Sequence, residues 1–226
     1  MSLSANSESV SYAKAVGVKT AAESGDRIVW VKLSLAFLPL ATPVSDAKVL
    51  TGRQKPLTEV AIIIAEIRTR DGFEGVGFSY SKRAGGQGIY AHAKEIADNL
   101  LGEDPSDIDK IYSKLLWAGA SVGRSGMAVQ AISPIDIALW DIKGKALNQP
   151  VYQLLGGKVR DRLLAYTHAT GWSTPELLES VDAIRERGFT AIRAQSGVPG
   201  LDSVYGVQRH RDAYEPASRG AKPVVE

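Results

Sequence analysis

Alternating apolar positions mark three extended segments in the first part of the chain. In the segment 28–36 every second residue is apolar, and one side is formed by Val29, Val31, Leu33 and Leu35. The run 58–68 is rich in β-branched residues, and Asp71-Gly72 separates it from a second strand-like run, 73–80. Strand-like runs on both sides of an Asp-Gly pair predict a β-hairpin. We therefore predict a three-stranded antiparallel sheet.

Helical spacing replaces this alternation from residue 89 onward. Apolar residues recur three or four positions apart over 89–100 and again over 108–115, where Asp104-Pro105 is typical of a helix start. The long segment 125–147 continues the pattern and contains Pro134, which we expect to kink the helix. A short further turn is expected over 150–155. Sheet and helices together predict an α+β domain.

A strand–helix–strand pattern begins at residue 163. Strand-like runs over 163–169 and 189–195 flank a helix that Thr174-Pro175 opens and Gly188 ends. Such a unit predicts two parallel strands joined by a right-handed crossover. We interpret it as the start of a TIM-type (β/α) barrel that is incomplete in this chain, because a whole barrel takes roughly 200 residues or more. From Leu163 to the end there are 64 residues.

The expected organisation therefore has three parts. Residues 1–25, rich in Ser, Ala and Glu, are expected to form a mobile N-terminal tail. Residues 26–158 form the α+β domain. Residues 159–226 hold the first βαβ unit of the barrel, followed by a loop-like tail in which no periodicity survives after Ser196.

Composition excludes several kinds of partner. The formal net charge of +2 is too small to indicate binding to nucleic acid. The most apolar segment, 28–44, contains Lys32, Pro39 and Pro43 and is shorter than the roughly 20 apolar residues of a membrane span, so no membrane partner is expected. The chain has no cysteine, which rules out a disulfide framework. Because residues 1–25 lack a cleavable-signal pattern, we expect a cytoplasmic protein.

The segment 131–156 contains a motif at recognisable spacing. Its matching positions are Ala131, Ser133, Asp136, Ala138, Asp141, Gly144, Lys145, Pro150, Leu154 and Gly156, whereas Pro134 stands in place of a small residue. This motif resembles that of the mandelate racemase/muconate lactonizing family of the enolase superfamily, which implies an enolase-type capping domain over 26–158. In physical terms the segment is an amphipathic helix with small residues for close packing, and we interpret Asp136 and Asp141 as hydrogen-bonding groups rather than catalysts.

Two finer resemblances divide the chain. Residues 26–141 are similar to galactarate/L-talarate dehydratases, and residues 142–217 are similar to D-mannonate dehydratases. A chimeric gene and an unusual branch of the family would both produce this division. Either resemblance implies Mg²⁺-dependent chemistry on a sugar acid, in which a proton α to the carboxylate is abstracted and water is lost. The product would be a 2-keto-3-deoxy sugar acid.

The ligands for that Mg²⁺ ion are expected to be absent from this chain. In the family, three carboxylates at the ends of later barrel strands hold the ion. After Phe189 the acidic residues fall in loop-like sequence and form no such cluster on a strand; they are Asp202, Asp212, Glu215 and Glu226. We therefore assign no metal-binding residue.

The resemblance also implies roles for five residues. Arg193 and Tyr205 match an Arg–Tyr pair that abstracts the proton, and a guanidinium beside a phenol favours the phenolate. His168 matches a substrate-contacting histidine, and Lys82 with Arg83 would suit the second carboxylate of a diacid. Taken alone, the residues leave structural alternatives open: a solvated Arg193, a Tyr205 packed on the barrel rim, a buried His168 and two solvated cations.

The sequence thus supports two functional hypotheses. The first is the N-terminal portion of a Mg²⁺-dependent acid-sugar dehydratase of galactarate/talarate or mannonate type, with a sugar acid as its small-molecule partner. The second is a catalytically inactive truncated or chimeric remnant that acts only as an interaction module, which the missing acidic triad favours. In both cases we expect a homo-oligomer, because an incomplete barrel leaves apolar faces and a sheet edge uncovered.

Overall fold

The computed structural model describes residues 7–13, 25–46, 49, 54–171 and 173–195. Contacts within the chain define two compact units: the first lies within residues 1–40 and 59–159, and the second within 41–58 and 160–226. Each unit is described by itself. None of the helices formed by the described residues is long and apolar enough to cross a membrane.

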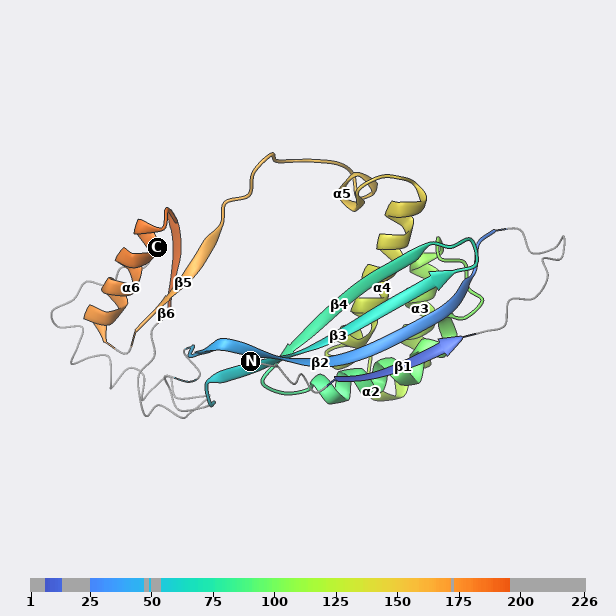
Figure 1. Cartoon of the computed structure of the whole chain (residues 1–226), viewed down its shortest axis with the longest axis horizontal. Coiled ribbons are helices and arrows are strands. Elements are labelled where there is room, and N and C mark those ends of the chain that lie inside the picture. The colour runs from blue at the N-terminus through green and yellow to red at the C-terminus, as the bar shows by residue number, and fades with distance from the viewer. Residues whose placement is uncertain (1–6, 14–24, 47–48, 50–53, 172, 196–226) are drawn as a thin grey trace. The chain divides into compact units, whose positions relative to one another are not determined.

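The first unit is built on an antiparallel sheet of four strands, one more than we predicted (Figure 1). The strands are β1 (Ser7–Ala13), β2 (Ile28–Val44), β3 (Leu57–Thr69) and β4 (Glu74–Lys82), and they lie side by side in that order. The added strand, β1, falls in the segment 1–25. Its alternate residues are mostly Ser, which is typical of turns and loops, so its pattern is weak.

The register explains why β1 nevertheless forms a strand. Val10 lies opposite Leu33 and Tyr12 opposite Val31 in the antiparallel pairing of β1 with β2. Both side chains pack against the apolar core. The Tyr12 hydroxyl also donates a hydrogen bond of 2.8 Å to the Lys94 carbonyl oxygen. Two apolar anchors and one such bond are enough to hold an edge strand whose other side chains are small and polar.

The predicted hairpin is confirmed between β3 and β4. The two strands pair in antiparallel register from Val60 with Lys82 to Arg68 with Glu74. Gly72 in the connecting turn has φ 92°, a left-handed conformation that glycine adopts without steric cost. The Asp71-Gly72 pair therefore marks the turn that the sequence predicted.

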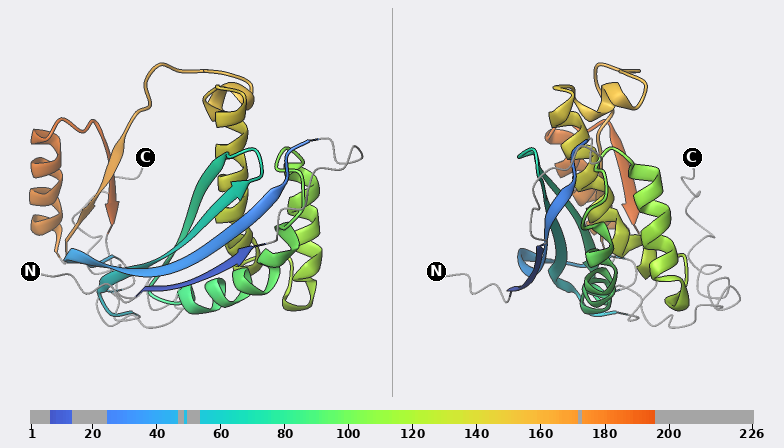
Figure 2. Two further views of the ribbon diagram at one scale, coloured as in Figure 1. Left: turned by 45° about the vertical axis from the view of Figure 1, so that its right-hand side comes forward. Right: turned by 90° about the vertical axis from the view of Figure 1, so that its right-hand side faces the viewer.

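Helices cover one face of this sheet. They are α2 (Gly86–Ala97), α3 (Ile108–Ala118), α4 (Met127–Ala146) and the short α5 (Val151–Leu154), with 3-10 turns at Asp98–Leu100 and Ala120–Val122. In the right-hand view of Figure 2 the blue-to-teal strands form one layer and the green-to-yellow helices form a second layer beside it.

The start of α3 differs from our prediction. The helix begins at Ile108 with Asp107 as its N-cap residue, not at Asp104-Pro105. Asp104 instead accepts hydrogen bonds from the Ser106 backbone (2.9 Å) and hydroxyl (2.7 Å), which closes a local turn. Its other oxygen pairs with Arg27 at 3.1 Å. An Asp-Pro pair can open a turn as readily as a helix, and the hydrogen bonds from Ser106 to Asp104 stabilise the turn.

The apolar core lies between the sheet and the helices. Alternate residues of β2 over 31–35 and of β3 over 61–67 face it, and each long helix contributes residues at helical spacing. Among its fully buried members are Val31, Leu33, Leu35, Ile63, Ala65, Ile67, Ile89, Ala93, Ile96, Ile111, Leu115, Ala131, Ile135, Ala138, Leu139 and Ile142. The predicted strand and helix patterns therefore meet in one core.

The second unit contains the predicted βαβ arrangement. Strands β5 (Tyr166–Thr170) and β6 (Ala191–Gln195) pair in parallel, and α6 (Thr174–Glu186) connects them. A capping box starts α6: the Ser173 hydroxyl accepts from the Glu176 backbone N–H, and the Glu176 carboxylate accepts from the Ser173 backbone N–H. Ala169 of β5 is fully buried and Ile184 of α6 is 7% exposed, so the helix covers one face of the pair.

Candidate functional site

Two of the predicted site residues lie directly opposite each other in the second unit. His168 of β5 and Arg193 of β6 are register partners in the parallel pairing. Residues in register on neighbouring strands project to the same face of a sheet. Both side chains are exposed. The crossover through α6 thus brings together two residues that are 25 positions apart in the sequence.

A third polar side chain, Tyr166, lies on this face, and our sequence analysis did not select it. Tyr166 precedes His168 by two positions on β5, and the centroids of the two rings are 5.5 Å apart. The Tyr166 side chain is 59% exposed. The alternation of β5 contained the signal, because residues two apart on a strand share a face. We call Tyr166, His168 and Arg193 the strand-pair site.

The geometry of the strand-pair site follows from the alternation of β5. Ala169 is buried, whereas His168 and Tyr166, on the other face, are exposed. The polar side chains therefore project away from the covered face. Tyr205, which the sequence analysis expected beside His168 and Arg193, lies outside the described residues.

The other two candidates lie in the first unit, where β4 ends. Lys82 is the last residue of β4, and its ammonium group lies 5.7 Å from the centroid of the Tyr80 ring, within reach of a cation–π interaction. Arg83 follows in the turn before α2 with φ 67°, an uncommon conformation for a residue with a side chain. The two cations are adjacent in sequence but belong to different local structures.

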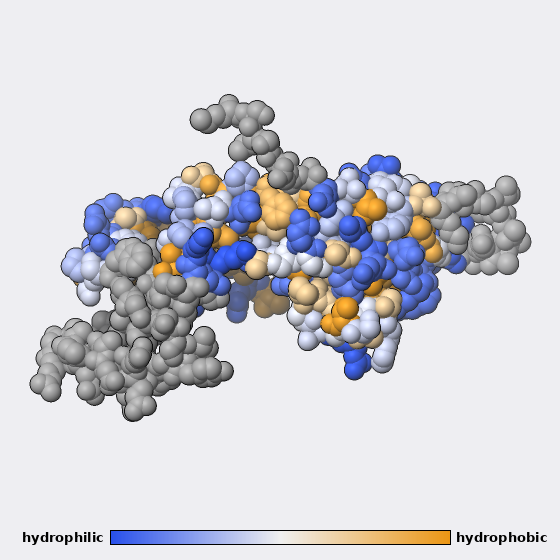
Figure 3. Space-filling view, turned by 90° about the horizontal axis from the view of Figure 1, so that it is seen from below, coloured by the Kyte–Doolittle hydropathy of each residue, from blue (hydrophilic) through white to orange (hydrophobic). Residues whose placement is uncertain are grey.

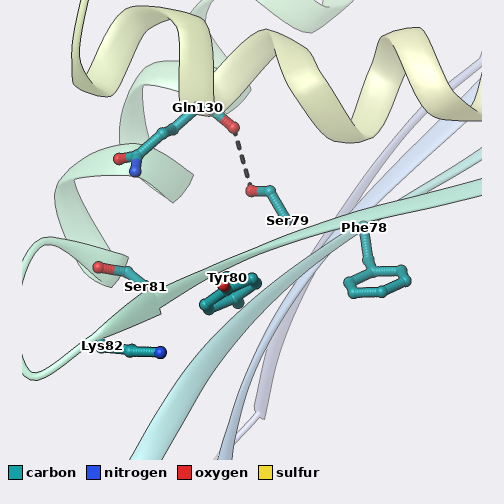
Figure 4. A pocket seen from close by; sticks show the side chains of 6 residues that line it. All are labelled: Phe78, Ser79, Tyr80, Ser81, Lys82 and Gln130. Atoms are coloured by element: carbon teal, nitrogen blue, oxygen red, sulfur yellow. Dashed lines mark hydrogen bonds between the residues drawn. The ribbon is translucent and has the colours of Figure 1, made fainter. Parts of the chain in front are cut away.

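Lys82 also lines a hollow on the first unit. The hollow has a volume of about 580 Å³ and is lined by Phe78, Ser79, Tyr80, Ser81, Lys82 and Gln130. Figure 4 shows Ser79 directed toward Gln130 of α4, whereas Phe78 and Tyr80 lie on the opposite side of the strand. The Ser79 hydroxyl donates a hydrogen bond of 3.0 Å to the Gln130 carbonyl oxygen.

Residues of the 131–156 motif join α4 to β4. A Cβ atom on Gly75 or Gly77 would overlap the backbone carbonyl of Ala138 or Pro134, so only glycine permits this approach of helix and strand. The close approach therefore depends on two glycines of β4, which lie outside the motif.

Polar motif residues complete the same contact at the backbone of β4. The Val76 backbone N–H donates to Asp141 at 3.0 Å, and the Lys145 ammonium donates to the Glu74 carbonyl at 2.7 Å. Lys145 also pairs with Asp141 at 2.7 Å. Because β4 is an edge strand, these bonds satisfy groups that a neighbouring strand would otherwise pair. The expected hydrogen-bonding role of Asp141 is thus visible in the structure.

The described residues do not fit a Mg²⁺ ion. No group of three or more His, Asp or Glu side chains comes close enough to hold a metal among residues 7–13, 25–46, 49, 54–171 and 173–195. A stable Mg²⁺ site needs oxygen ligands arranged nearly octahedrally. The acidic residues 202, 212, 215 and 226 lie outside the described part.

Known proteins resemble this chain closely. Residues 46–156 match the family model described as "Mandelate racemase / muconate lactonizing enzyme, N-terminal domain". The chain is 73% identical over 202 residues to L-talarate/galactarate dehydratase from Salmonella typhimurium, covering 88% of this chain and 50% of that enzyme. It is 37% identical over 177 residues to D-mannonate dehydratase from Xanthomonas oryzae pv. oryzicola, covering 74% of this chain and 42% of that enzyme.

Solved structures agree with these similarities. The crystal structure of the Salmonella talarate/galactarate dehydratase liganded with Mg and L-lyxarohydroxamate aligns with a TM-score of 0.72 at 66% identity. The alignment covers 91% of this chain and 52% of that chain. The chain spans about half the length of the curated relatives it matches.

Proposed function

Because the chain belongs to the mandelate racemase/muconate lactonizing family of the enolase superfamily, we propose that it is the N-terminal portion of an acid-sugar dehydratase. The proposed reaction abstracts the proton α to the carboxylate of a sugar acid and expels water, giving a 2-keto-3-deoxy sugar acid. The proposal treats residues 26–158 as the capping domain and residues 159–226 as the start of the barrel. The similarity at 73% identity over 88% of the chain favours a talarate or galactarate substrate over mannonate.

The observation that carries the proposal is the pairing of His168 with Arg193 on the exposed face of the β5–β6 pair. In a (β/α) barrel the helices lie outside, so the face opposite the helix is the one that faces the barrel interior, and the reaction centre lies where the strands end at their carboxyl side. A cation and an imidazole side by side on that face would attract a carboxylate. We assign His168 to substrate binding on this basis.

Arg193 has the second proposed role, together with Tyr205. A guanidinium close to a phenol stabilises the phenolate and makes it a stronger base. The Tyr205 phenolate would accept the α-proton. The positive charge of Arg193 would stabilise this phenolate before the proton is transferred. Mg²⁺ would supply the stabilisation of the enediolate in a complete enzyme. No group of described residues would hold that ion.

Lys82 and Arg83 are assigned to the far end of the substrate. Galactarate and talarate are diacids, so a site for either needs positive charge for the carboxylate that does not react. Lys82 is the last residue of β4, and Arg83 follows it in the turn before α2. Their charge and position support this role, which would distinguish diacids from the monoacid mannonate.

A dehydration assay of the purified chain tests the proposal. Galactarate, L-talarate and D-mannonate would each be supplied with Mg²⁺, and the 2-keto-3-deoxy product detected. The expected result is turnover that falls about 100-fold or more in Arg193→Lys and Tyr205→Phe, the range typical of a lost acid–base group. Arg185→Lys, on the solvent side of α6, is the matched control and should keep the activity of the wild type.

The opposite outcomes are equally informative. Turnover that survives Arg193→Lys would remove Arg193 from the reaction. Absence of product from all three acids would overturn the activity for this chain and support the catalytically inactive interaction module. Circular dichroism of each variant separates a loss of chemistry from a loss of fold.

A further inference from the structure

The ring of Tyr166 lies against the imidazole that the proposed function assigns to substrate binding. The centroids of the Tyr166 and His168 rings are 5.5 Å apart, and the two ring planes are tilted by 32°. Aromatic pairs attract each other at centroid distances of about 4.5–7 Å when the rings are offset or tilted rather than stacked directly face to face. The Tyr166 ring is therefore within contact distance of a candidate substrate-binding side chain.

Exposure alone would not single out Tyr166. Single apolar or aromatic side chains among hydrophilic ones are normal on a protein surface, and Figure 3 shows apolar and hydrophilic residues interspersed on one side of the molecule. Tyr166 differs in what it contacts, because its neighbour on the same face of β5 is His168. A role for Tyr166 therefore has to follow from this contact.

The register leaves the Tyr166 ring free to lie along its own strand. Opposite Tyr166 on β6 is Ala191, which carries only a methyl group, and opposite His168 is Arg193. A small side chain beside Tyr166 leaves room on this face, whereas a large one would compete with the imidazole for contact with the ring. The imidazole thus has an aromatic ring as its neighbour along β5 and Arg193 as its register partner on β6.

The direction of β5 places Tyr166 on the far side of His168 from the proposed reaction centre. The two parallel strands end at Thr170 and Gln195, and active sites of (β/α) barrels form at the carboxyl ends of the strands. Tyr166, the first residue of β5, is two positions farther from that end than His168, about 7 Å at about 3.3 Å per residue. Its ring can therefore support the imidazole without occupying the space of the substrate.

We propose that Tyr166 is a positioning residue, whose ring holds the His168 imidazole in the orientation that binds a carboxylate of the sugar acid. This inference rests on the proposed function, which assigns His168 to substrate binding. An exposed histidine rotates about its side-chain bonds, and only some of its orientations present a ring nitrogen to the substrate. The ring of Tyr166 removes part of this freedom before the substrate arrives, so less order has to be imposed on binding.

The tyrosine ring, rather than its hydroxyl, has this role, because the contact joins the faces and edges of two rings. Phenylalanine should therefore replace Tyr166, whereas leucine, which is apolar but not planar, should not. A residue that only filled space would accept leucine about as well as phenylalanine. The two substitutions thus separate the positioning of His168 from the packing of the strand pair.

Nuclear magnetic resonance of the full chain tests the contact without any substrate. The chain has three histidines, His92, His168 and His210, and the ring signals lost in His168→Gln are those of His168. A nuclear Overhauser effect between the ring protons of residues 166 and 168 should occur in the wild type and in Tyr166→Phe. In Tyr166→Leu the His168 signals should move toward those of a solvated histidine. Absence of the effect in the wild type would overturn this proposal and leave the proposed function untouched.

Isothermal titration calorimetry with galactarate, in the presence of Mg²⁺, tests the consequence for binding. Tyr166→Leu should weaken binding about five- to tenfold, the cost of ordering one side chain, and Tyr166→Phe should recover at least about half of the wild-type affinity. Tyr152→Leu, the same change at a comparably exposed site on α5, is the matched control and should bind as the wild type does. Circular dichroism checks the fold of each variant, and Tyr166→Met replaces Tyr166→Leu if leucine is not tolerated.

A double variant decides whether Tyr166 acts through His168. In a His168→Gln background the ring has no imidazole to hold, so Tyr166→Leu should cause little further loss of affinity. Equal losses in both backgrounds, or wild-type affinity in Tyr166→Leu, would overturn the positioning role. A wild type that shows the ring contact but binds no galactarate would overturn it together with the assignment of His168 to substrate binding, and the dehydration assay tests the proposed reaction separately.

Discussion

The carboxyl of Asp136 lies half-buried on α4, within the 131–156 motif. Burial, and to a smaller extent the negative charge of Asp109 on α3, raises the pKa of Asp136 above its ordinary value. The folded chain therefore holds the Asp136 proton more tightly than the unfolded chain does. It follows that the ionised carboxylate lowers the free energy of unfolding at neutral pH, and that this cost disappears as the pH falls below the unfolded pKa.

We accordingly expect Asp136→Asn to stabilise the fold. At pH 7 the gain in the free energy of unfolding should be up to about 1 kcal/mol, and it should shrink as the pH falls to about 3, where the wild-type carboxyl is protonated in both states. Urea unfolding of both proteins at a series of pH values measures this difference in the free energy of unfolding. Asp182→Asn, an exposed residue of α6, is the control and should show no comparable gain. A variant less stable than the wild type at pH 7 would show that Asp136 has a favourable partner.

At the scale of elements, Pro134 and Ser79 act together across the contact of α4 with β4. Proline has no backbone N–H, so the Gln130 carbonyl four residues earlier loses its donor within the helix. Ser79 of β4 supplies the missing donor at 3.0 Å (Figure 4). Helix α4 can thus continue through Pro134 because the neighbouring strand satisfies the carbonyl that proline leaves unpaired.

This arrangement predicts an energetic coupling between the two residues. Ser79→Ala should lower the free energy of unfolding by about 1 kcal/mol in the wild type, because it leaves a carbonyl unpaired. In a Pro134→Ala background the helix provides its own N–H for the Gln130 carbonyl. Ser79→Ala should then lower the free energy of unfolding by at least about 0.5 kcal/mol less than in the wild type. Thermal or urea unfolding of the four proteins measures the cycle. Ser113→Ala on the exposed side of α3 should show no such dependence, and equal costs in both backgrounds would refute the coupling.

The elements also show which parts of the fold can be predicted from sequence. Strong alternation of apolar residues and an Asp-Gly turn predict β2, β3 and β4. A change from strand-like to helical spacing of apolar residues and back again predicts β5, α6 and β6. Strand β1 could not be predicted in this way, because Val10 and Tyr12 are its only large apolar residues and the anchoring Tyr12–Lys94 bond is a tertiary contact. The start of α3 was misplaced because a tertiary ion pair with Arg27 and local bonds hold Asp104 in a turn.

The strand-pair site, too, could be predicted from the sequence only in part. The sequence placed His168 and Arg193 on two parallel strands, but their alignment depends on the register that α6 imposes. No single-residue signal reports a register, which is set by the packing of the whole crossover. Tyr166 was overlooked for the opposite reason: its alternation with His168 was visible, but the resemblance that selected the other residues did not include it.

At the scale of the whole molecule, the chain matches relatives about twice its length, and solved relatives are liganded with Mg. The described residues hold no acidic cluster, so the rise of the thermal unfolding midpoint with millimolar Mg²⁺ that the proposed turnover requires should come from ligands outside them. Only a ligand that binds the folded state raises that midpoint. Differential scanning fluorimetry with and without EDTA makes the comparison, with Ca²⁺ as a second ion. An unchanged midpoint would contradict Mg²⁺-dependent turnover by this chain and support the catalytically inactive interaction module.

The contact of α4 with β4 has a consequence for synthesis on the ribosome. Glu74 and Lys145, which it joins, are 71 residues apart in the sequence. At about 5–20 residues per second, roughly 4 to 14 s pass between the emergence of the two. During this interval β4 exposes backbone groups that Asp141 and Lys145 later bind, next to the apolar row of Val76, Phe78 and Tyr80. The nascent chain is therefore most in need of a holding chaperone after the hairpin has left the exit tunnel and before the helix follows it.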